Sequence, residues 1–232
     1  MIMIKQVLVV KETREGESRV ALTPETISSL SSRQYRVLVE TGAGLKAGFT
    51  DFDYIKAGAE IFVLSSEGFP ADTLILRVKL PNESREHLEK KLFHENTFIM
   101  GFLDSLNSSI AEARIADWQA MGVTTFSVDL FKSLLIHDPK NMQAAMSRIA
   151  GRLAFKDGLK RYIGENPVKL TVIGTGPAAF SAISEARKAG IPVQVFGRQE
   201  RHRIELEMAG VLYHILPEPC RYPQASNEYL SV

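Results

Sequence analysis

One stretch constrains the fold of this chain more than any other. The apolar run 170–173 leads directly into a G-x-G-x-x-A pattern, and a helical pattern over 180–189 and a strand pattern over 193–196 follow. In dinucleotide-binding folds the first glycine permits a tight turn, the second lets a pyrophosphate approach the backbone, and the small third residue allows close helix–sheet packing. The stretch predicts a phosphate-binding turn, with a glycine turn kept for packing alone as the alternative. The predicted cofactor-binding residues of this turn are Gly174, Thr175, Gly176, Pro177, Ala178 and Ala179.

Strand and helix patterns alternate along the rest of the chain. Strand patterns cover 5–10, 35–40, 60–63, 73–78, 97–103, 123–128 and 211–216, and helical patterns cover 24–33, 51–57, 83–92, 110–121 and 200–208. Short loops between such elements indicate βαβ units and mostly parallel sheets. We therefore predict an α/β fold with two Rossmann-like or flavodoxin-like domains.

The longest helical pattern opens at Asp138 and continues to about Ile163. Apolar residues at helical spacing predict one buried face on this helix; they are Met142, Ala145, Met146, Ile149 and Leu153. We interpret residues 1–138 as a first α/β domain, 139–164 as a linking helix and 165–232 as a partial Rossmann domain. The partial domain corresponds to one βαβαβ half of a dinucleotide fold, the half that holds adenosine and pyrophosphate. After Pro217 the periodicity is lost, which predicts an irregular tail.

Composition excludes several classes of function. The 28 basic and 27 acidic residues nearly balance, so nothing favours nucleic acid or an anionic membrane as a partner. The single cysteine, Cys220, excludes an internal disulfide and fits a reducing compartment. Neither a transmembrane run nor metal-ligand spacing of histidines is present, and the short apolar start fits a buried strand better than a signal peptide. We expect a soluble, cytoplasmic protein without a metal site.

A series of motifs extends along residues 4–216. It comprises Arg19-Val-Ala-Leu-Thr-Pro24, Val39-Glu-Thr-Gly-Ala-Gly44, Asp51-x-x-Tyr-x-x-Ala-Gly-Ala59, Val78-Lys-x-Pro81 and Met146-Ser-Arg-Ile-Ala-Gly-Arg152. Together with the glycine turn, these motifs resemble those of the alanine dehydrogenase and nicotinamide nucleotide transhydrogenase (alpha subunit) family. The resemblance implies two α/β domains separated by a cleft, in which the nicotinamide ring of NAD or NADP meets its hydride partner.

The same resemblance implies roles for two cations of the first domain. Arg19 matches the arginine that holds the substrate carboxylate in alanine dehydrogenases, and a guanidinium fork suits a carboxylate bidentately. Lys79 matches the lysine that polarises the keto oxygen. The alternative is that both are surface charges on loops.

Two departures from the family patterns concern the reacting groups. Asp104 stands where alanine dehydrogenases carry a histidine, and a carboxylate titrates too low to replace an imidazole at neutral pH. Transhydrogenases also lack that histidine, and the spacing between residues 129 and 146 resembles theirs. However, Ser133, Asp138 and Asn141 occupy the positions at which that branch places arginine, glutamine and aspartate to hold the nicotinamide.

A third departure lies at the end of the second nucleotide-binding strand. An acidic residue is expected there for the ribose 2′-hydroxyl, but this chain has Gly197 and Arg198. Loss of the carboxylate with gain of an arginine is a pattern that admits the 2′-phosphate of NADP. The alternative is that Arg198, Arg201 and Arg203 are solvated charges at a helix start.

Two functions remain open. One is an NAD(P)-dependent oxidoreductase, nearer the transhydrogenase alpha subunit by layout and at most peripheral to a membrane subunit, or else an alanine dehydrogenase-like amino acid dehydrogenase. The other is a truncated or diverged non-catalytic relative that binds a nucleotide or a small carboxylic acid, and the chain could also be a fragment of a longer product. The last strand pattern, 211–216, would form an unpaired sheet edge, from which we expect a homodimer.

Overall fold

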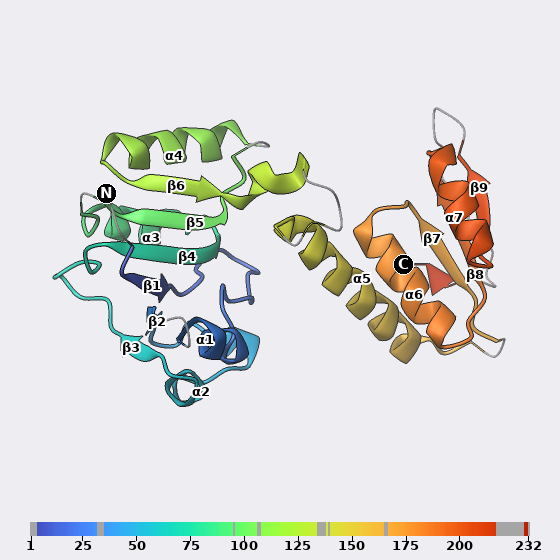
Figure 1. Ribbon diagram of the computed structural model, residues 1–232, viewed down its shortest axis with the longest axis horizontal. Coiled ribbons are helices and arrows are strands. Elements are labelled where there is room, and N and C mark those ends of the chain that lie inside the picture. Colours follow the sequence, from blue (N-terminus) through green and yellow to red (C-terminus); the bar gives the residue numbers. More distant parts are fainter. Residues whose placement is uncertain are drawn as a thin grey trace. The chain divides into compact units, whose positions relative to one another are not determined.

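The computed structural model describes residues 4–31, 35–94, 96–105, 108–133, 138, 140–164, 167–216 and 230–231. The chain divides into two compact units, Met1–Leu130 and Phe131–Val232 (Figure 1). The two units divide after Leu130, before the predicted boundary at residue 138. The predicted linking segment 139–164 therefore belongs to unit 2. The functional domain boundaries stay a prediction.

Unit 1 is an α/β domain built on one parallel sheet. Its six strands lie in the order β3-β2-β1-β4-β5-β6. The elements in chain order are β1 (Gln6–Val9), α1 (Pro24–Ser31), β2 (Arg36–Glu40), η1 (Leu45–Ala47), α2 (Asp51–Lys56), β3 (Glu60–Phe62), β4 (Thr73–Lys79), α3 (Glu83–Lys90), β5 (Phe98–Phe102), α4 (Ser109–Ala120) and β6 (Thr124–Ser127). The segment η2 (Val128–Ser133) follows β6. The predicted α/β fold is confirmed.

Hydrophobic cores cover both faces of this sheet, because successive side chains of a strand point to opposite faces. Leu8 and Val10 belong to a core that also contains Trp118 of α4. Val9, between them, belongs to a second core with Ile27 of α1. The continuous apolar run of β1 thus suits a central strand that is buried on both sides.

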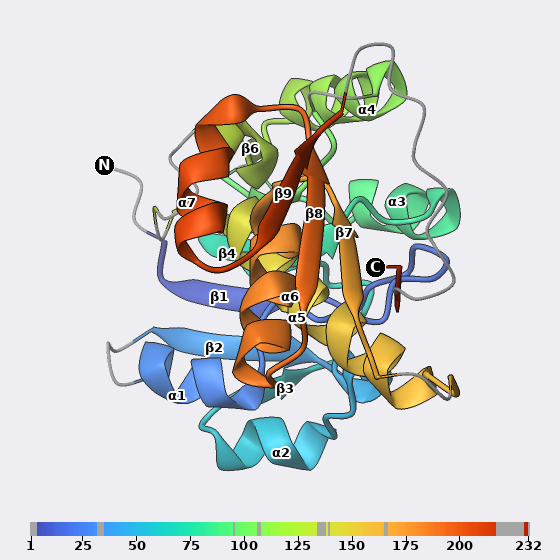
Figure 2. The ribbon, with the colours of Figure 1, turned by 90° about the vertical axis from the view of Figure 1, so that its right-hand side faces the viewer.

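Unit 2 contains the predicted βαβαβ half. Its elements are α5 (Met142–Arg161), β7 (Leu170–Ile173), α6 (Pro177–Lys188), β8 (Val193–Gly197), η3 (Glu200–His202), α7 (Arg203–Met208), β9 (Leu212–Ile215) and β10 (Leu230–Ser231). The strands are parallel in the order β10-β7-β8-β9, and Figure 2 shows β7, β8 and β9 side by side with α7 beside β9.

Three details of unit 2 correct the sequence-based expectations. The predicted helix 200–208 is divided into η3 and α7, and α6 begins at Pro177 rather than at Phe180. Proline suits the first helical position, where its missing N–H has no helical partner to lose. The tail after Pro217 is not irregular throughout, because Leu230–Ser231 pairs with β7.

The predicted buried face of α5 is wrong. Met142, Ile149 and Leu153 are 44%, 44% and 56% exposed. The buried residues of the helix are Ala144, Gly151 and Phe155. Gly151 lets the helix approach α6 closely, and Phe155 packs into the core of unit 2.

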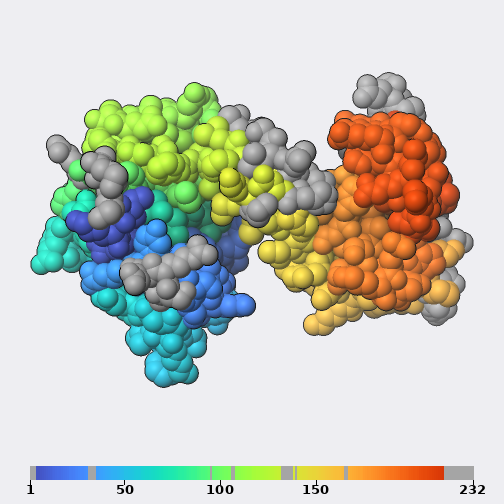
Figure 3. All heavy atoms as spheres, in the orientation of Figure 1, coloured from blue at the N-terminus to red at the C-terminus, as the bar shows by residue number. Residues whose placement is uncertain are grey.

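Strand β9 lies at one edge of the described part of the unit 2 sheet, as predicted. Leu212 on this strand is 57% exposed, and Ile204 and Met208 on the neighbouring α7 are also exposed. The space-filling view shows this segment, coloured orange-red, at the surface of unit 2 (Figure 3). An unpaired edge with exposed apolar side chains is compatible with self-association, and the homodimer stays a prediction for light scattering.

Candidate functional site

The glycine turn of unit 2 connects β7 to α6. Gly174 has a φ of +107°, which favours glycine, and its N–H donates to the carbonyl of Phe196 at 2.7 Å. Gly176 is the N-cap of α6, and no side chain caps this helix start among the described residues. Since Pro177 has no N–H, the free donors of the first turn belong to Ala178 and Ala179.

The space in front of this turn is open. A Cβ placed on Gly174 or on Gly176 would meet no heavy atom of the described residues within 4 Å. The turn lines a pocket of about 480 Å³, a size typical of small-molecule sites. Free backbone donors at a helix start, together with open space, fit the pyrophosphate of a dinucleotide.

The end of β8 forms the opposite wall of this pocket. Gly197, Arg198 and Gln199 line it, and so do Arg201 and His202 of η3. Gly197 has no room for a side chain, because a Cβ there would overlap the ring and hydroxyl of Tyr213. The hydroxyl of Tyr213 is held in turn by donating to the carbonyl of Gln199 at 2.9 Å.

Helix α5 supports the glycine turn from behind. A Cβ on Gly151 would overlap the backbone of Ala178, so the two helices touch directly at the first turn of α6. This contact gives a physical reason for Gly151 in the predicted motif. It fixes the start of α6, where the free donors lie.

A second group of polar residues lies in unit 1, at the carboxyl ends of its strands. The order β3-β2-β1-β4-β5-β6 reverses direction between β1 and β4, and ligands of open α/β sheets bind at such a switch point. The loop after β1 carries Arg14 and Arg19, Lys79 ends β4, and Asp104 follows β5. Topology therefore brings the predicted residues of this domain to one edge of the sheet.

Arg19 is already paired with a carboxylate. Its Nε and Nη2 donate to the two oxygens of Glu17 at 2.8 and 2.6 Å, and its backbone N–H donates to Glu17 as well. The hydrogen bond from Arg19 lowers the pKa of Glu17 despite partial burial, and the charge of Lys79 contributes in the same direction. Both predicted cations thus act on one carboxylate.

Lys79 is paired with Asp104. Its Nζ lies 3.0 Å from one oxygen of Asp104, and Arg14 lies 2.9 Å from the other. Burial alone would raise the pKa of Asp104, but the hydrogen bonds from the two cations lower it below its ordinary value. The backbone N–H of Asp104 donates to Asp129 at 2.8 Å, which helps to hold its left-handed φ of +55°.

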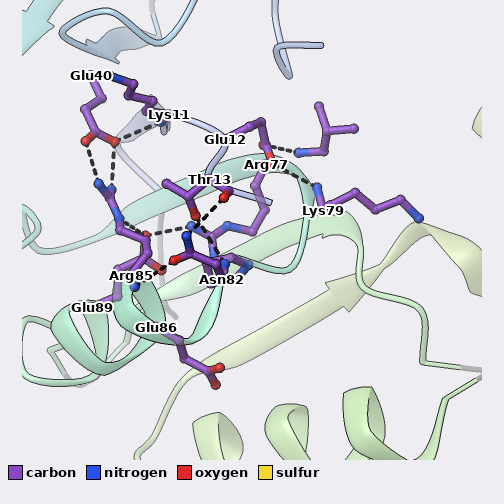
Figure 4. A network of polar contacts seen from close by, with 12 residues as sticks. Lys11, Glu12, Thr13, Glu40, Arg77, Lys79, Asn82, Arg85, Glu86 and Glu89 are labelled. Carbon is purple, nitrogen blue, oxygen red and sulfur yellow. Dashed lines mark hydrogen bonds and ion pairs between the residues drawn. The ribbon is translucent and has the colours of Figure 1, made fainter. Parts of the chain in front are cut away.

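Further polar contacts fix the loops of this edge (Figure 4). Glu12 accepts from the backbone N–H groups of Val78 and Lys79 at 2.5 and 3.2 Å, and burial raises its pKa. Asn82 is bonded to Thr13 through its N–H and its side-chain amide, so the loop after β1 is joined to the loop after β4.

Behind these loops, the network continues into the interior of unit 1. Glu40 accepts from the backbone of Lys11 at 2.8 Å and from both terminal nitrogens of Arg85 at 2.7 Å. Glu89, which is almost fully buried, pairs with Arg85 and with the equally buried Arg77. The charged groups below the carboxyl end of the sheet are therefore paired with one another.

We compared the chain with models of known protein families. Residues 8–150 match the family model described as "Alanine dehydrogenase/PNT, N-terminal domain". The chain belongs to the alanine dehydrogenase/PNT family.

Individual relatives and solved structures agree with this family assignment. Alanine dehydrogenase 1 of Staphylococcus aureus is 37% identical over 146 residues, which cover 63% of this chain and 36% of the relative. A transhydrogenase from Sinorhizobium meliloti has a TM-score of 0.76 at 26% identity, over 91% of this chain and 62% of that one. An L-alanine dehydrogenase has a TM-score of 0.68 at 25% identity, over 90% of this chain and 60% of that one. The match thus spans about a third of the curated relatives' length.

The three positions predicted to lie near a nicotinamide have different surroundings. Asn141 is buried and caps α5 by accepting from the N–H of Ala144 at 2.9 Å. Asp138 accepts from the N–H of Lys140 at 2.8 Å. Ser133 ends η2, and its side chain lies outside the described residues. Contacts of these three with a nicotinamide stay predictions.

Several residues that shape the two sites were missed from the sequence. Glu17 and Arg14, which pair with Arg19 and Asp104, gave no motif beyond a charge-dense loop. His202 lines the pocket of unit 2 together with Arg201, which the sequence offered only as a solvated charge, whereas Arg203 pairs with Glu200 and Glu207. Among the described residues, no helix is both long enough and apolar enough to cross a bilayer.

Proposed function

We propose that this chain binds NAD or NADP through unit 2 and that it serves hydride transfer of the alanine dehydrogenase/transhydrogenase type. The open glycine turn is the observation that carries the proposal. It combines free N–H donors at Ala178 and Ala179, a left-handed Gly174, and a pocket with room for a ligand. Family membership supports the same cofactor.

In this proposal each part of the pocket has a definite role. The first turn of α6 holds the pyrophosphate, and the end of β8, at Gly197 and Arg198, faces the adenosine ribose. When bound, the nicotinamide supplies or accepts the hydride. We propose that Ser133, Asp138 and Asn141 lie near that ring, by the family resemblance.

The pairing of charges in unit 1 favours the transhydrogenase type over an amino acid dehydrogenase. A keto acid bound by Arg19 and Lys79 would have to displace Glu17 and Asp104 from their cations. These internal carboxylates compete directly with a substrate carboxylate, because they use the same donor groups. We therefore propose that the catalytic contribution of Arg19, Lys79 and Asp104 is weak toward small carboxylic acids.

The same pairing keeps a second function open, a nucleotide-binding relative without turnover. Alanine-, pyruvate- and NAD(P)H-dependent hydride exchange by the isolated chain distinguishes the two. Exchange at rates usual for this enzyme class supports the oxidoreductase. Nucleotide binding without exchange supports the non-catalytic relative.

Nucleotide binding itself is tested by a Gly176→Asp variant. Gly176 has an ordinary φ of −84° and open space beside it, so aspartate fits without strain. Aspartate at an N-cap stabilises a helix by about a few tenths of a kcal/mol relative to glycine, while its charge and its hydrogen bonds block the phosphate site. We expect a well-folded variant whose affinity for NAD, NADP and ADP-ribose falls at least about tenfold.

The matched control is Ser108→Asp, which changes the N-cap of α4 in unit 1. It introduces the same charge at the same kind of position and should leave the calorimetric titration unchanged. A folded wild-type chain that binds none of the three nucleotides would refute the proposal and leave the glycine turn a packing feature.

A further inference from the structure

The pocket of unit 2 is cationic at the end of β8. Arg198 directly follows the strand, and Arg201 and His202 of η3 line the same pocket. None of the described residues that line it is acidic. This is the position where an NAD site places a carboxylate for the ribose 2′-hydroxyl.

The missing carboxylate is a consequence of local packing. A side chain at position 197 would overlap Tyr213, whose hydroxyl is anchored on the carbonyl of Gln199. An acidic residue could be restored there only by moving that tyrosine. The next acidic residue along the chain, Glu200, forms an ion pair with Arg203.

Gln199 holds two of the side chains that line the pocket, Arg201 and His202. The amide oxygen of Gln199 accepts from Nε of Arg201 at 2.8 Å and lies 3.1 Å from Nε2 of His202. This bond leaves the two terminal nitrogens of Arg201 without a hydrogen bond to the described residues. Arg198 is exposed, and within the same part of the chain it has neither a hydrogen bond nor an ion pair.

From this arrangement we infer that the pocket prefers a 2′-phosphorylated adenosine nucleotide, the chemistry of NADP, with Arg198 and Arg201 as the residues that contact the 2′-phosphate. The inference rests on the proposed nucleotide function and deepens it. Two guanidinium groups offer paired N–H donors that suit phosphate oxygens. NAD would place an unphosphorylated ribose against the same groups, where they gain no charge-assisted hydrogen bond.

The test compares ADP-ribose with 2′-phospho-ADP-ribose by calorimetric titration of the full chain at low salt. The two probes differ by one phosphate, and neither contains the nicotinamide. We expect the phosphorylated probe to bind at least about tenfold more tightly, because charge-assisted hydrogen bonds contribute most in a pocket. Raising the salt concentration should reduce the ratio, since Arg198 is exposed.

Two variants assign the preference to its residues. Arg198→Ala should bring the ratio of the two affinities to within about threefold while binding of ADP-ribose persists. Arg187→Ala is the matched control, because Arg187 is an exposed arginine in the last turn of α6 and does not line this pocket. It should leave the ratio as in the wild type.

The outcomes separate the inference from the proposed function. Equal affinities, or tighter binding of ADP-ribose, would overturn the 2′-phosphate preference and leave nucleotide binding intact. A preference that survives in Arg198→Ala would overturn the role of that residue. A folded chain that binds neither probe would overturn the proposed function itself, and this inference with it.

Discussion

Asp104 is the residue on which the charge balance of the unit 1 edge depends. Its two oxygens hold Lys79 and Arg14, and its backbone has a left-handed φ of +55°. Aspartate and asparagine tolerate this conformation better than most residues do. The position can therefore lose its charge without losing its backbone shape.

An Asp104→Asn variant should turn this edge into an anion site. Lys79 and Arg14 would lose their anionic partner, so pyruvate or another small carboxylate should bind about three- to tenfold more tightly, as expected for partly exposed charges. Calorimetric titration measures this. Asp72→Asn, which frees Lys5 from an exposed ion pair elsewhere in unit 1, is the control and should show no gain. An unchanged affinity in Asp104→Asn would mean that the pair does not compete with ligands.

Glu17 makes stability depend on pH. Its pKa is lowered in the folded state, first by the hydrogen bond from Arg19, so its stabilising contribution is present above the unfolded pKa of about 4.3 and is lost as the pH falls through the lower folded value. Glu17→Gln should lower the free energy of unfolding by roughly 0.5–1 kcal/mol at pH 7, since Arg19 is partly exposed. Urea unfolding at pH 7 and pH 3 should show this difference shrinking in acid. A constant difference would argue against the ionic origin.

Residue motifs predicted where the charges lie but not how they pair. Arg19, Lys79 and Asp104 were found by their place in motifs, and topology brings them to one edge. The loop also contains Glu15 and Glu17, and only the folded backbone selects Glu17 as the partner of Arg19. Pairing depends on side-chain direction, which spacing in a flexible loop does not encode.

At the scale of elements, the crossing of α5 and α6 decides how precisely the phosphate turn is placed. Gly151→Ala should force the helices apart, because the added methyl group overlaps the backbone of Ala178. Overpacking of this kind costs about 1–3 kcal/mol, and nucleotide affinity should fall with it. Ala154→Leu adds a larger group on the exposed side of the same helix and serves as the control. Chemical denaturation followed by circular dichroism compares the two, and equal stability would refute a close crossing.

The face of α5 shows what an apolar pattern cannot predict. Periodicity identified the helix correctly, but predicted core residues such as Met142 and Leu153 are exposed, whereas Phe155 is buried. Contact with α6 selects small size at Gly151, which a hydrophobic scale does not register. The strands were easier to predict, because runs such as Gln6–Val9 are buried on both faces.

At the scale of the whole molecule, two units with separate cores should unfold in separate transitions. The single tryptophan, Trp118, is buried in the core of unit 1 and reports on that unit alone. A nucleotide at 100 times its dissociation constant stabilises the unit that binds it by about 2.7 kcal/mol. We expect NADP to raise the midpoint temperature of one unfolding transition observed by circular dichroism. The midpoint observed by Trp118 fluorescence should stay unchanged.

Coincident transitions that shift together would show that the two units unfold as one cooperative body. The Gly176→Asp variant supplies the control, since its weaker binding should reduce the ligand-induced shift at the same NADP concentration without lowering the melting temperature of unit 2.

The hydrogen bonds of Glu12, Thr13 and Glu40 affect how any molecule binds to the unit 1 edge. Loops held by hydrogen bonds between side chains and backbone have lost conformational freedom during folding, so an incoming ligand does not have to organise them. Selectivity among small molecules at this edge should therefore depend on how well a ligand compensates the local charges. The enthalpy of binding should contain little contribution from ordering of these loops.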